Sequence, residues 1–333
     1  MTRKSEQACW VGFDLGGTKM LAAVFDGRFR LIGTAKVKTK GQDGLRAVLS
    51  RVSATIRAAL AEARVPAGRV AGIGVGFPGP VDPERGIILA APNLGWRNVP
   101  LRRVLERRFR CRAIVANDVD AGTYAEYRFG AARGARSVLG VFPGTCIGGA
   151  FLYEGRLIRG RRVTCMEFGH VTVEPGGRRC GCGRRGCLEA VASRLAISAE
   201  AAAAVYRGEA PGLAREAGTD LADIKSGTLA KAIRAGDRVV ERIVRDAAGR
   251  LGDAIGGAIN LLAPDVVVLG GGLVEALPRL FLHEVRRAAE RNAMAPFAGS
   301  FRVATARLGD LATALGAAAL AADAADAGGR TAR

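Results

Sequence analysis

Apolar residues of the first third of the chain occur either in short runs or at helical spacing, and the two patterns follow one another. Short apolar runs bounded by glycine, proline or polar residues predict buried strands. Such strands are expected at 9–15, 21–25, 31–37, 70–77 and 111–118. Apolar side chains three or four positions apart predict a helix at 45–60, and a second helix is expected at 100–109.

The rest of the chain repeats the opening pattern and then becomes mainly helical. Strands are expected at 137–142 and 150–158, on either side of the glycine-rich turn PGTCIGG, as for the first two strands. The region 197–262 is expected to be helical, a fully apolar strand follows at 265–273, and a helix at 311–325 closes the chain. Strands that alternate with helices predict an α/β fold, here in two halves built on one plan.

The length and charge of the chain limit its class. A length of 333 residues exceeds the ~150 residues of one typical domain, so two domains are expected. The 50 Lys and Arg outnumber the 31 Asp and Glu, which gives a net charge of +19, but they lie in short clusters such as 102–110. A solvated, arginine-rich surface explains this pattern, and a surface for polyanions such as a polyphosphate donor is the alternative. Nucleic acid is not expected as a partner, because long basic runs and interleaved aromatic residues are missing.

Membrane and secretory segments are not expected. The apolar runs are shorter than the ~20 residues of a membrane span, and the polar lead-in MTRKSEQACW lacks the apolar region of a signal peptide. We therefore expect a cytoplasmic protein that binds no membrane. Seven cysteines in such a chain do not indicate a disulfide framework. Cys9, Cys111 and Cys165 stand singly and are expected to fill space in the core.

Three glycine-rich turns follow predicted strands. The first, DLGGTK, combines glycines that let backbone N–H groups approach an anion with the Thr18 hydroxyl and the Lys19 ammonium, and Asp14 could orient water around Mg²⁺. A plain hairpin turn also explains this segment. A second such turn at 143–149 and the cluster LGGGL at 269–273 favour a nucleotide site in which two hairpins close on a polyphosphate. The expected nucleotide-binding residues are Asp14, Gly16, Gly17, Thr18, Lys19, Gly144, Thr145, Gly148, Gly270, Gly271 and Gly272.

These three clusters resemble the actin-like ATPase (ribonuclease H-like) superfold shared by hexokinases, sugar kinases and heat-shock chaperones. A more specific resemblance, over nearly the whole chain, is to the ROK family. Its strongest part is EFGHVTVEPGGRRCGCGRRGCLEA at 167–190, which looks like the family signature Glu-x-x-His, Cys-x-Cys, four residues, Cys-Leu-Glu. The resemblance implies two α/β domains with a cleft between them. They are expected at 1–128, with the helix 311–325 packing back on it, and at 129–310, which is larger and carries the signature loop.

The signature also implies a metal site. His170, Cys180, Cys182 and Cys187 offer one nitrogen and three sulfurs, a closed tetrahedral set of the kind that holds structural Zn²⁺. A redox or incidental cysteine cluster is the alternative. Four protein ligands leave no open position for substrate, so we expect the ion to fix the loop 167–190 and not to take part in chemistry.

The resemblance further implies which residues face a sugar. Asn117 and Asp118 follow a buried strand, and ligands of open α/β sheets bind beyond the carboxyl ends of strands. We therefore favour a ligand-binding role for this pair over a helix N-cap, the usual interpretation of an isolated Asn-Asp. Asp118 stands where the family has its catalytic Asp. The expected sugar-binding residues are Gly79, Asn93, Asn117, Asp118, Glu167, His170 and Glu189.

The second glycine turn departs from the family pattern, which usually reads Gly-Thr-Gly-Ile-Gly-Gly-Gly. Cys146 and Ala150 replace two of those glycines. A Cβ at position 146 would crowd a backbone that needs positive φ or close contact with phosphate. Either the position tolerates the side chain, or the affinity for the phosphate donor is reduced.

The resemblance predicts an ATP-dependent kinase that phosphorylates the primary hydroxyl of a hexose, with Mg²⁺ at the phosphates and glucose as the favoured substrate. Kinases for N-acetylmannosamine, fructose, mannose or allose share most of these residues, and a polyphosphate-using glucokinase is a further alternative. A sugar-responsive ROK transcriptional regulator is less favoured, because no helix-turn-helix domain fits before the strand that begins at Cys9. A homodimer is expected from the family.

Overall fold

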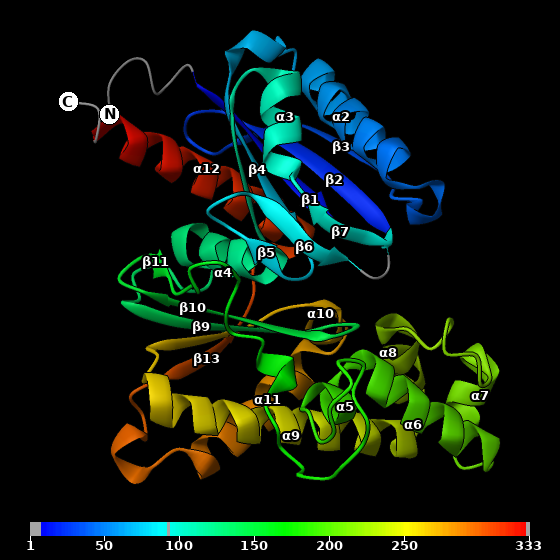
Figure 1. The fold of residues 1–333 in the computed structure, drawn as a ribbon. Helices are drawn as coiled ribbons and strands as arrows, with labels where there is room; N and C mark the ends of the chain where they lie inside the picture. The colour runs from blue at the N-terminus through cyan, green and yellow to red at the C-terminus, as the bar shows by residue number, and fades with distance from the viewer. Residues whose placement is uncertain (1–7, 92–93, 331–333) are drawn as a thin grey trace. The chain divides into compact units, whose positions relative to one another are not determined.

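The computed structural model describes residues 8–91 and 94–330. The described chain forms two compact units, which Figure 1 shows in ribbon form. Unit 1 comprises 1–133, 155–165 and 308–333, and unit 2 comprises 134–154 and 166–307. The segment 155–165, which the sequence placed in the second domain, thus packs within unit 1. The expected α/β architecture is confirmed in both units.

Unit 1 is built on a five-stranded sheet with the strand order β3-β2-β1-β4-β8. The strands are β1 (Cys9–Leu15), β2 (Lys19–Phe25), β3 (Leu31–Lys38), β4 (Val70–Phe77) and β8 (Arg112–Asn117). β1, β2 and β3 form an antiparallel meander, whereas β4 and β8 continue the sheet in parallel from β1. The carboxyl ends of β1, β4 and β8 therefore lie at one edge of the sheet.

Helices cover both faces of this sheet (Figure 1). They are α2 (Leu45–Glu62), α3 (Leu101–Phe109), α4 (Asp118–Phe129) and α12 (Ala312–Arg330). Val11 and Phe13 of β1 pack in one apolar cluster with α2 and α3, while Trp10 packs in another with α4 and α12. This division follows from the strand geometry, because successive side chains point to opposite faces.

The alanine-rich helix α12 lies unusually close to the sheet. A Cβ on Gly12 would lie 1.8 Å from the carbonyl oxygen of Ala314, and one on Gly74 would lie 1.8 Å from that of Ala317. On the other side of the helix, a Cβ on Gly316 would meet the carbonyl of Ala121 in α4 at 1.8 Å. The small residues are therefore what allows the backbones of α12, the sheet and α4 to approach one another.

A small second sheet and short helices complete unit 1. The sheet has the order β5-β6-β7, from β5 (Val81–Asp82), β6 (Ile87–Ala91) and β7 (Trp96–Val99). The 3₁₀ helices are η1 (Gly41–Asp43), η2 (Ala67–Arg69) and η6 (Gly309–Leu311), and the short strand β11 spans Arg156–Leu157.

Unit 2 repeats the central strand arrangement of unit 1. Its sheet contains the order β10-β9-β12-β13, from β9 (Ser137–Pro143), β10 (Ile147–Tyr153), β12 (Val266–Leu269) and β13 (Arg302–Thr305). The β9–β10 pair is antiparallel and β9, β12 and β13 are parallel, as for β1–β2 and β1-β4-β8. The expectation of two halves built on one plan is confirmed.

The helical part of unit 2 is longer than that of unit 1. Its helices are α5 (Glu189–Ala192), α6 (Arg194–Tyr206), α7 (Pro211–Ala217), α8 (Ser226–Arg234), α9 (Arg238–Leu262), α10 (Gly272–Ala276), α11 (Pro278–Asn292), with 3₁₀ helices η4 (Phe168–His170) and η5 (Ala295–Phe297). Gly252 and Gly256 of α9 lie directly against α11, where an added Cβ would come within 2.6 Å of Ala288 and Asn292. Gly249 and Gly257 have no neighbour within 4 Å at that position, so close packing explains only two of the four glycines.

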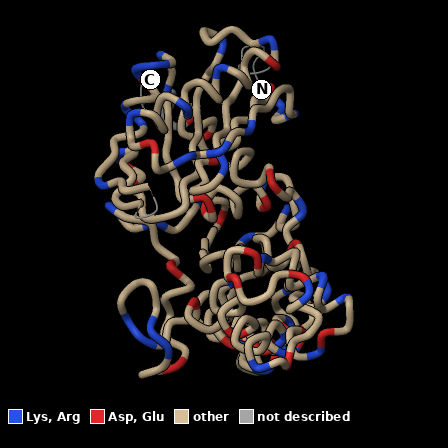
Figure 2. The backbone as a smooth tube through the Cα atoms, turned by 90° about the vertical axis from the view of Figure 1, so that its right-hand side faces the viewer, with Lys and Arg blue, Asp and Glu red and all other residues tan. Residues whose placement is uncertain are grey.

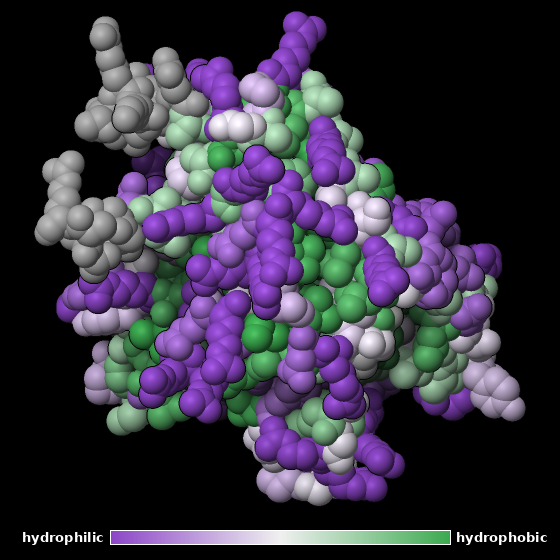
Figure 3. Space-filling view, turned by 45° about the horizontal axis from the view of Figure 1, so that its top comes forward, coloured by the Kyte–Doolittle hydropathy of each residue, from purple (hydrophilic) through white to green (hydrophobic). Residues whose placement is uncertain are grey.

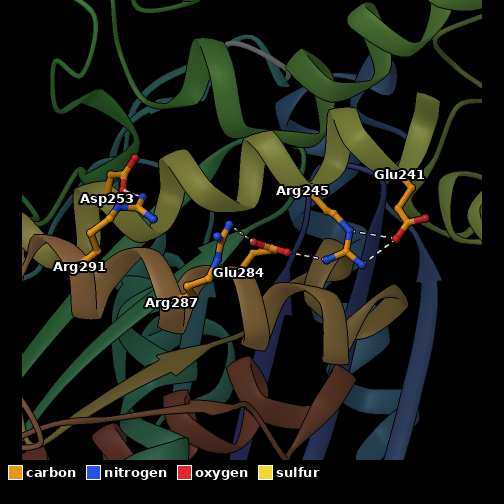
Figure 4. Close-up of polar contacts among 6 residues, drawn as sticks. All are labelled: Glu241, Arg245, Asp253, Glu284, Arg287 and Arg291. Carbon is orange, nitrogen blue, oxygen red and sulfur yellow. Dashed lines mark hydrogen bonds and ion pairs between the residues drawn. The ribbon is translucent and has the colours of Figure 1, made fainter. Parts of the chain in front are cut away.

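Ion pairs also join α9 to α11 (Figure 4). Arg245 Nη1 donates to Glu284 Oε1 at 2.5 Å, and Arg287 Nη2 donates to the other oxygen at 2.8 Å. Burial raises the pKa of Glu284, but the hydrogen bonds from Arg245 and Arg287 outweigh it and hold that pKa below its usual value. A further pair links Arg291 to Asp253 at 2.8 Å. The Arg245–Glu284 and Arg291–Asp253 pairs therefore link α9 to α11, whereas Glu284 and Arg287 both lie on α11.

The remaining charges are distributed over the surface. Lys and Arg occur along the backbone of both units, with Asp and Glu between them (Figure 2). On the face shown in Figure 3, hydrophilic side chains are interspersed with apolar ones. Among the helices of the described residues, none combines the length and apolar character needed to cross a membrane.

Candidate functional site

The first glycine turn joins β1 to β2, and Thr39 forms hydrogen bonds with its backbone. The Thr39 hydroxyl donates to the carbonyl of Gly16 at 2.6 Å, and its backbone N–H donates to the carbonyl of Thr18 at 2.9 Å. Gly17, Thr18 and Lys19 are exposed. The turn is therefore accessible to solvent at the edge of the sheet where β1 ends.

A cluster of charges surrounds this turn. Asp310 of η6 accepts a hydrogen bond from Lys19 Nζ at 3.2 Å and one from Lys36 Nζ at 3.1 Å. These contacts lower the pKa of Asp310, with Lys36 contributing most. Asp310 was not predictable from the sequence, because 291 residues separate it from Lys19 and no local pattern marks it.

Asp14, at the end of β1, has an unusual titration. Burial, together with the nearby negative charge of Asp118, raises the pKa of Asp14 to about 7, and Lys19 opposes the shift. A buried carboxylate near another negative charge favours a bound cation or a retained proton. Asp14 lies near the carboxyl end of β1, and Asp118 directly follows β8 at the same edge of the sheet.

Asp118 lies where β8 gives way to α4. Its Oδ1 accepts a hydrogen bond from the backbone N–H of Val119 at 2.9 Å. Asn117 is the N-cap of α4, because its Oδ1 accepts from the backbone N–H groups of Val119 at 2.8 Å and Asp120 at 3.2 Å. The prediction that Asn117 binds a ligand in preference to capping a helix is therefore corrected: its side-chain oxygen satisfies the free N–H groups at the start of α4.

Asn117 also connects to Gly79. Its Nδ2 donates to the Gly79 carbonyl at 3.3 Å, and Gly79 has φ 133°, a conformation that L-residues rarely adopt. The loop after β4 is therefore tied to the end of β8, next to Asp118. Asn93, the remaining sugar-facing residue expected in this half, lies outside the described residues.

A buried ion pair behind α4 was not anticipated. Asp120 is 3% exposed and its Oδ2 lies 3.3 Å from Arg159 Nε. Arg159 belongs to the segment 155–165, whose packing in unit 1 the sequence did not indicate. A carboxylate that is buried to this degree needs a paired cation. The ion pair therefore fixes the segment 155–165 to the first turn of α4.

In unit 2, the four expected metal ligands converge. One ligand atom from each of His170, Cys180, Cys182 and Cys187 lies within 4.8 Å of the others. The Cys182 and Cys187 sulfurs are 3.7 Å apart, and the Cys180 sulfur is 3.7 Å from His170 Nδ1. Zn–S bonds of about 2.3 Å at tetrahedral angles place two sulfurs about 3.8 Å apart, so the set fits Zn²⁺.

The glycines of this loop differ in whether another residue could replace them. Gly183 and Gly186 have φ of 89° and 79°, and a Cβ on Gly186 would lie 1.8 Å from the carbonyl oxygen of Glu174. A Cβ on Gly181 would meet only open space.

The cysteines of this loop differ in their pKa values. Burial raises the pKa of Cys180 to about 12, whereas the backbone N–H of Arg184 lowers the pKa of Cys182 to about 7. A bound cation would hold these sulfurs as thiolates.

The expected sugar carboxylates of this half differ in their surroundings. Glu167 is exposed, just before η4. Glu189 is the first residue of α5; its Oε2 accepts from the backbone N–H of Ile147 at 3.2 Å, and its Oε1 lies 3.6 Å from the Cys180 sulfur. Glu189 therefore links the cysteine loop to the second glycine turn. His170 directs Nδ1 at the cysteines, which leaves Nε2 for another partner.

The second glycine turn is tighter than expected. Ile147 already pairs with Pro143, so Gly144, Thr145 and Cys146 form the turn, and Gly148 lies in β10 opposite Phe142. The Gly144 N–H donates to the Cys146 carbonyl at 2.8 Å. Cys146 is exposed and does not belong to the described residues with left-handed φ, so its Cβ brings no backbone strain. Ala150 is fully buried in β10.

The third glycine cluster follows β12. A Cβ on Gly270 would lie 2.4 Å from the Phe142 ring, and Gly271, with φ 84°, precedes the first residue of α10. Arg194, which was not among the predicted site residues, contacts the second glycine turn. Its Nη2 donates to the Thr145 hydroxyl at 3.0 Å.

Comparison with known proteins agrees with this arrangement. The family model of the ROK family matches residues 10–324. The chain belongs to the ROK family. A glucokinase from Thermotoga maritima is 34% identical over 312 residues, which cover 93% of this chain and 96% of that protein.

Two further similarities place the chain within the family. The crystal structure of a ROK family glucokinase from Streptomyces griseus, in complex with glucose and AMPPNP, superposes with a TM-score of 0.83 at 32% identity and covers 95% of this chain and 100% of that one. The N-acetylglucosamine repressor from Escherichia coli O6:H1 is 32% identical over 248 residues, or 74% of this chain and 59% of the repressor. The predicted membership of the family, and with it the actin-like ATPase fold, is confirmed.

Proposed function

We propose that this ROK protein is a glucokinase, which transfers the γ-phosphoryl group of ATP to the primary hydroxyl of glucose. The observation that carries the proposal is the position of Asp14 and Asp118 at the carboxyl ends of β1 and β8, on either side of β4, in a chain whose match covers 96% of a glucokinase. Ligands of such sheets bind beyond these strand ends.

Asp118 is the proposed general base. It accepts the proton of the sugar hydroxyl as the hydroxyl oxygen bonds to the γ-phosphorus, and the bond from that phosphorus to the β-phosphate oxygen breaks to release ADP. Phosphoryl transfer passes through a loose transition state, so orientation of the reactants and stabilisation of charge carry most of the rate. The hydrogen bond from the Val119 N–H keeps the Asp118 carboxylate in place for this task.

The glycine turns are the proposed phosphate sites. Gly16, Gly17 and Thr18 are the proposed N–H and hydroxyl donors in unit 1. In unit 2 the proposed donor is the Thr145 hydroxyl, whereas Gly144, whose N–H bonds the Cys146 carbonyl, shapes the turn. Mg²⁺, when bound, would offset the negative charge of the phosphates, and Asp14 is the proposed acceptor for its water. A cation bound nearby would lower the raised pKa of Asp14 and favour its ionised form.

Zinc is proposed as a structural ion. His170, Cys180, Cys182 and Cys187 would hold it with all four positions occupied by protein, so the chain's own residues do the chemistry. Glu189 and His170 Nε2 are the proposed sugar-hydroxyl partners in this unit, together with Glu167. Carboxylates at fixed positions reject the wrong sugar isomer by leaving a buried polar group unpaired.

A transcriptional regulator is the competing function. The chain carries Asp118, the proposed general base, directly after β8 at the carboxyl end of that strand. This observation favours the kinase.

The experiment is a coupled assay across glucose, mannose, fructose, allose and N-acetylmannosamine, with ATP and with polyphosphate as separate donors. The expected result is the highest kcat/KM for glucose with ATP. A titration of DNA at micromolar protein and several salt concentrations tests the regulator. Phosphorylation no faster than that of an Asp118→Asn control for every pair of sugar and donor would overturn the kinase.

A homodimer is also proposed, on the family resemblance, with the helical region after residue 190 as the contact surface. Light scattering on the purified protein measures its mass, and the mass of a single chain at micromolar concentration would contradict the proposal.

A further inference from the structure

The turn between β9 and β10 is held at several points by the segment that follows the cysteine loop. Glu189 accepts from the N–H of Ile147, just after the turn, at 3.2 Å. Arg194 donates its backbone N–H to the carbonyl of Gly144 at 2.9 Å and its side chain to the Thr145 hydroxyl at 3.0 Å. The short segment that contains Glu189 and Arg194 therefore forms hydrogen bonds on both sides of the proposed phosphate turn.

The guanidinium of Arg194 is not neutralised by the groups it contacts. Its hydrogen bonds go to two neutral oxygens, the Thr145 hydroxyl at 3.0 Å and, more weakly, the Ile224 carbonyl at 3.5 Å. Arg194 is partly exposed, and Thr145 and Cys146 are exposed beside it. A guanidinium carries five N–H donors in a rigid fork that matches phosphate oxygens, and these two bonds use only part of them.

The hydrogen bond to Thr145 also sets the direction of that hydroxyl. A threonine oxygen that accepts a hydrogen bond keeps its own O–H as a donor. Because Arg194 supplies the bond that Oγ1 accepts, the Thr145 proton is available for an outside acceptor. Arg194 is in addition the first residue of α6, whose N-terminal N–H groups carry partial positive charge.

We propose that Arg194 is a phosphate-binding residue of this turn. Its guanidinium binds an oxygen of the terminal phosphates of a nucleoside triphosphate, and it holds the Thr145 hydroxyl as a second donor to the same group. The proposal rests on the proposed kinase function for the identity of the ligand. It adds a cation to a turn whose own sequence, Gly-Thr-Cys, has none.

The first experiment measures binding of ATP, ADP and AMP to the full chain by calorimetry, in the presence of Mg²⁺ and without sugar. Arg194→Ala should weaken ATP about tenfold, ADP less, and AMP less than twofold, because the lost contact is to the terminal phosphates. Arg194→Lys keeps the charge but loses the fork, and should weaken ATP about threefold. Equal affinities for ATP in wild type and both variants would overturn the proposal.

Arg207→Ala is the matched control, since it removes the same charge from the far end of α6, where Arg207 pairs with Glu209 at 2.7 Å. It should change ATP affinity less than twofold. A loss as large as that of Arg194→Ala would show a general charge effect and would contradict a contact at the turn. Thermal melting of each variant checks that it is folded, and the Arg194→Lys result decides if Arg194→Ala is not.

A double-mutant cycle with Thr145→Val separates direct contact from positioning. If Arg194 touches phosphate, Arg194→Ala should still weaken ATP at least threefold in the Thr145→Val background. If the effect vanishes there, Arg194 acts only through Thr145 and the direct contact is refuted.

Failure of the proposed function has a different signature. A wild type that binds ATP in an Arg194-dependent way but phosphorylates none of the sugars would refute the kinase and support the phosphate contact. A wild type that phosphorylates glucose while its ATP affinity ignores Arg194 would refute the phosphate contact alone. Absence of ATP binding by the wild type would refute both.

Discussion

The two glycine hairpins share a backbone plan but differ in the residues packed around their turns. In each unit an antiparallel hairpin begins the sheet and parallel strands extend it. The β1–β2 turn has an acid of its own strand behind it, Asp14, and a lysine pair bound to Asp310 beside it. The β9–β10 turn has neither, and is held instead by Glu189 and Arg194.

The difference shows that the repeat supplies a common backbone, while the side chains around each turn come partly from other segments of the chain. Asp310 reaches the first turn from the segment before α12, whereas Glu189 reaches the second because the cysteine loop ends two residues before it. Asp14 and Asp118, the acids proposed to bind a cation's water and to accept a proton, both lie in unit 1. Unit 2 contains Arg194 beside the second turn and the four proposed zinc ligands.

The largest expected effect concerns the acidic side of this comparison. Asp118→Asn should lower turnover by about 10²–10⁴-fold, the usual contribution of a general base, while glucose affinity and melting temperature stay near those of the wild type. Steady-state kinetics with glucose and ATP measure the loss. Asp223→Asn, an exposed acid of unit 2, is the control and should keep full turnover. Near-normal turnover of Asp118→Asn would remove Asp118 from the proposed role.

A second test uses the raised pKa of Asp14, about 7 in the folded chain against the usual 3.8. Between these values the folded protein holds a proton that the unfolded chain releases, so the stability contributed by this group falls as pH rises from about 4 to about 7. Asn cannot ionise. The stability of Asp14→Asn relative to wild type should therefore rise over this window, by at most about 4 kcal/mol.

Urea unfolding of both proteins at a series of pH values, in buffer without Mg²⁺, measures this difference. A relative stability that stays constant from pH 4 to pH 7.5 would show that Asp14 titrates normally. Asp223→Asn serves again as the control and should follow the wild type at each pH.

The substitution Cys187→Ser tests the proposed zinc site of unit 2. The wild type should contain about one Zn²⁺ per chain and the variant almost none, because a tetrahedral site that loses a thiolate binds far more weakly. Loss of the ion frees Glu189 from its contact with Ile147 and should lower the free energy of unfolding by more than about 2 kcal/mol. Metal analysis and urea unfolding measure the two effects. Cys111→Ser, in unit 1, should keep the zinc; equal zinc in both variants would exclude Cys187 as a ligand.

The smallest effect is expected at Cys146. Because its side chain is exposed and its φ is not left-handed, Cys146→Gly should change the KM for ATP less than twofold. A fall of tenfold or more would show that the thiol does obstruct the phosphate turn.

Local signals were sufficient for much of this molecule. Short apolar runs separated by a glycine turn predicted β1 and β2, and apolar residues at helical spacing predicted α2, each nearly to the residue. These signals are local because strand and helix periods appear within a few positions. The convergence of the four expected metal ligands was also predictable. His170 and the three cysteines lie within one short loop, so their spacing alone limits how far apart they can be.

Contacts between residues far apart along the chain were not predictable in this way. Asp310 beside Lys19, Arg159 beside Asp120 and Arg194 beside Thr145 each join segments whose meeting depends on how helices and sheets pack. Asn117 shows the same limit at short range, since its carbonyl oxygen caps α4 while its amide reaches Gly79. Periodicity encodes which face of an element is buried, but it does not encode which distant side chain that face will meet.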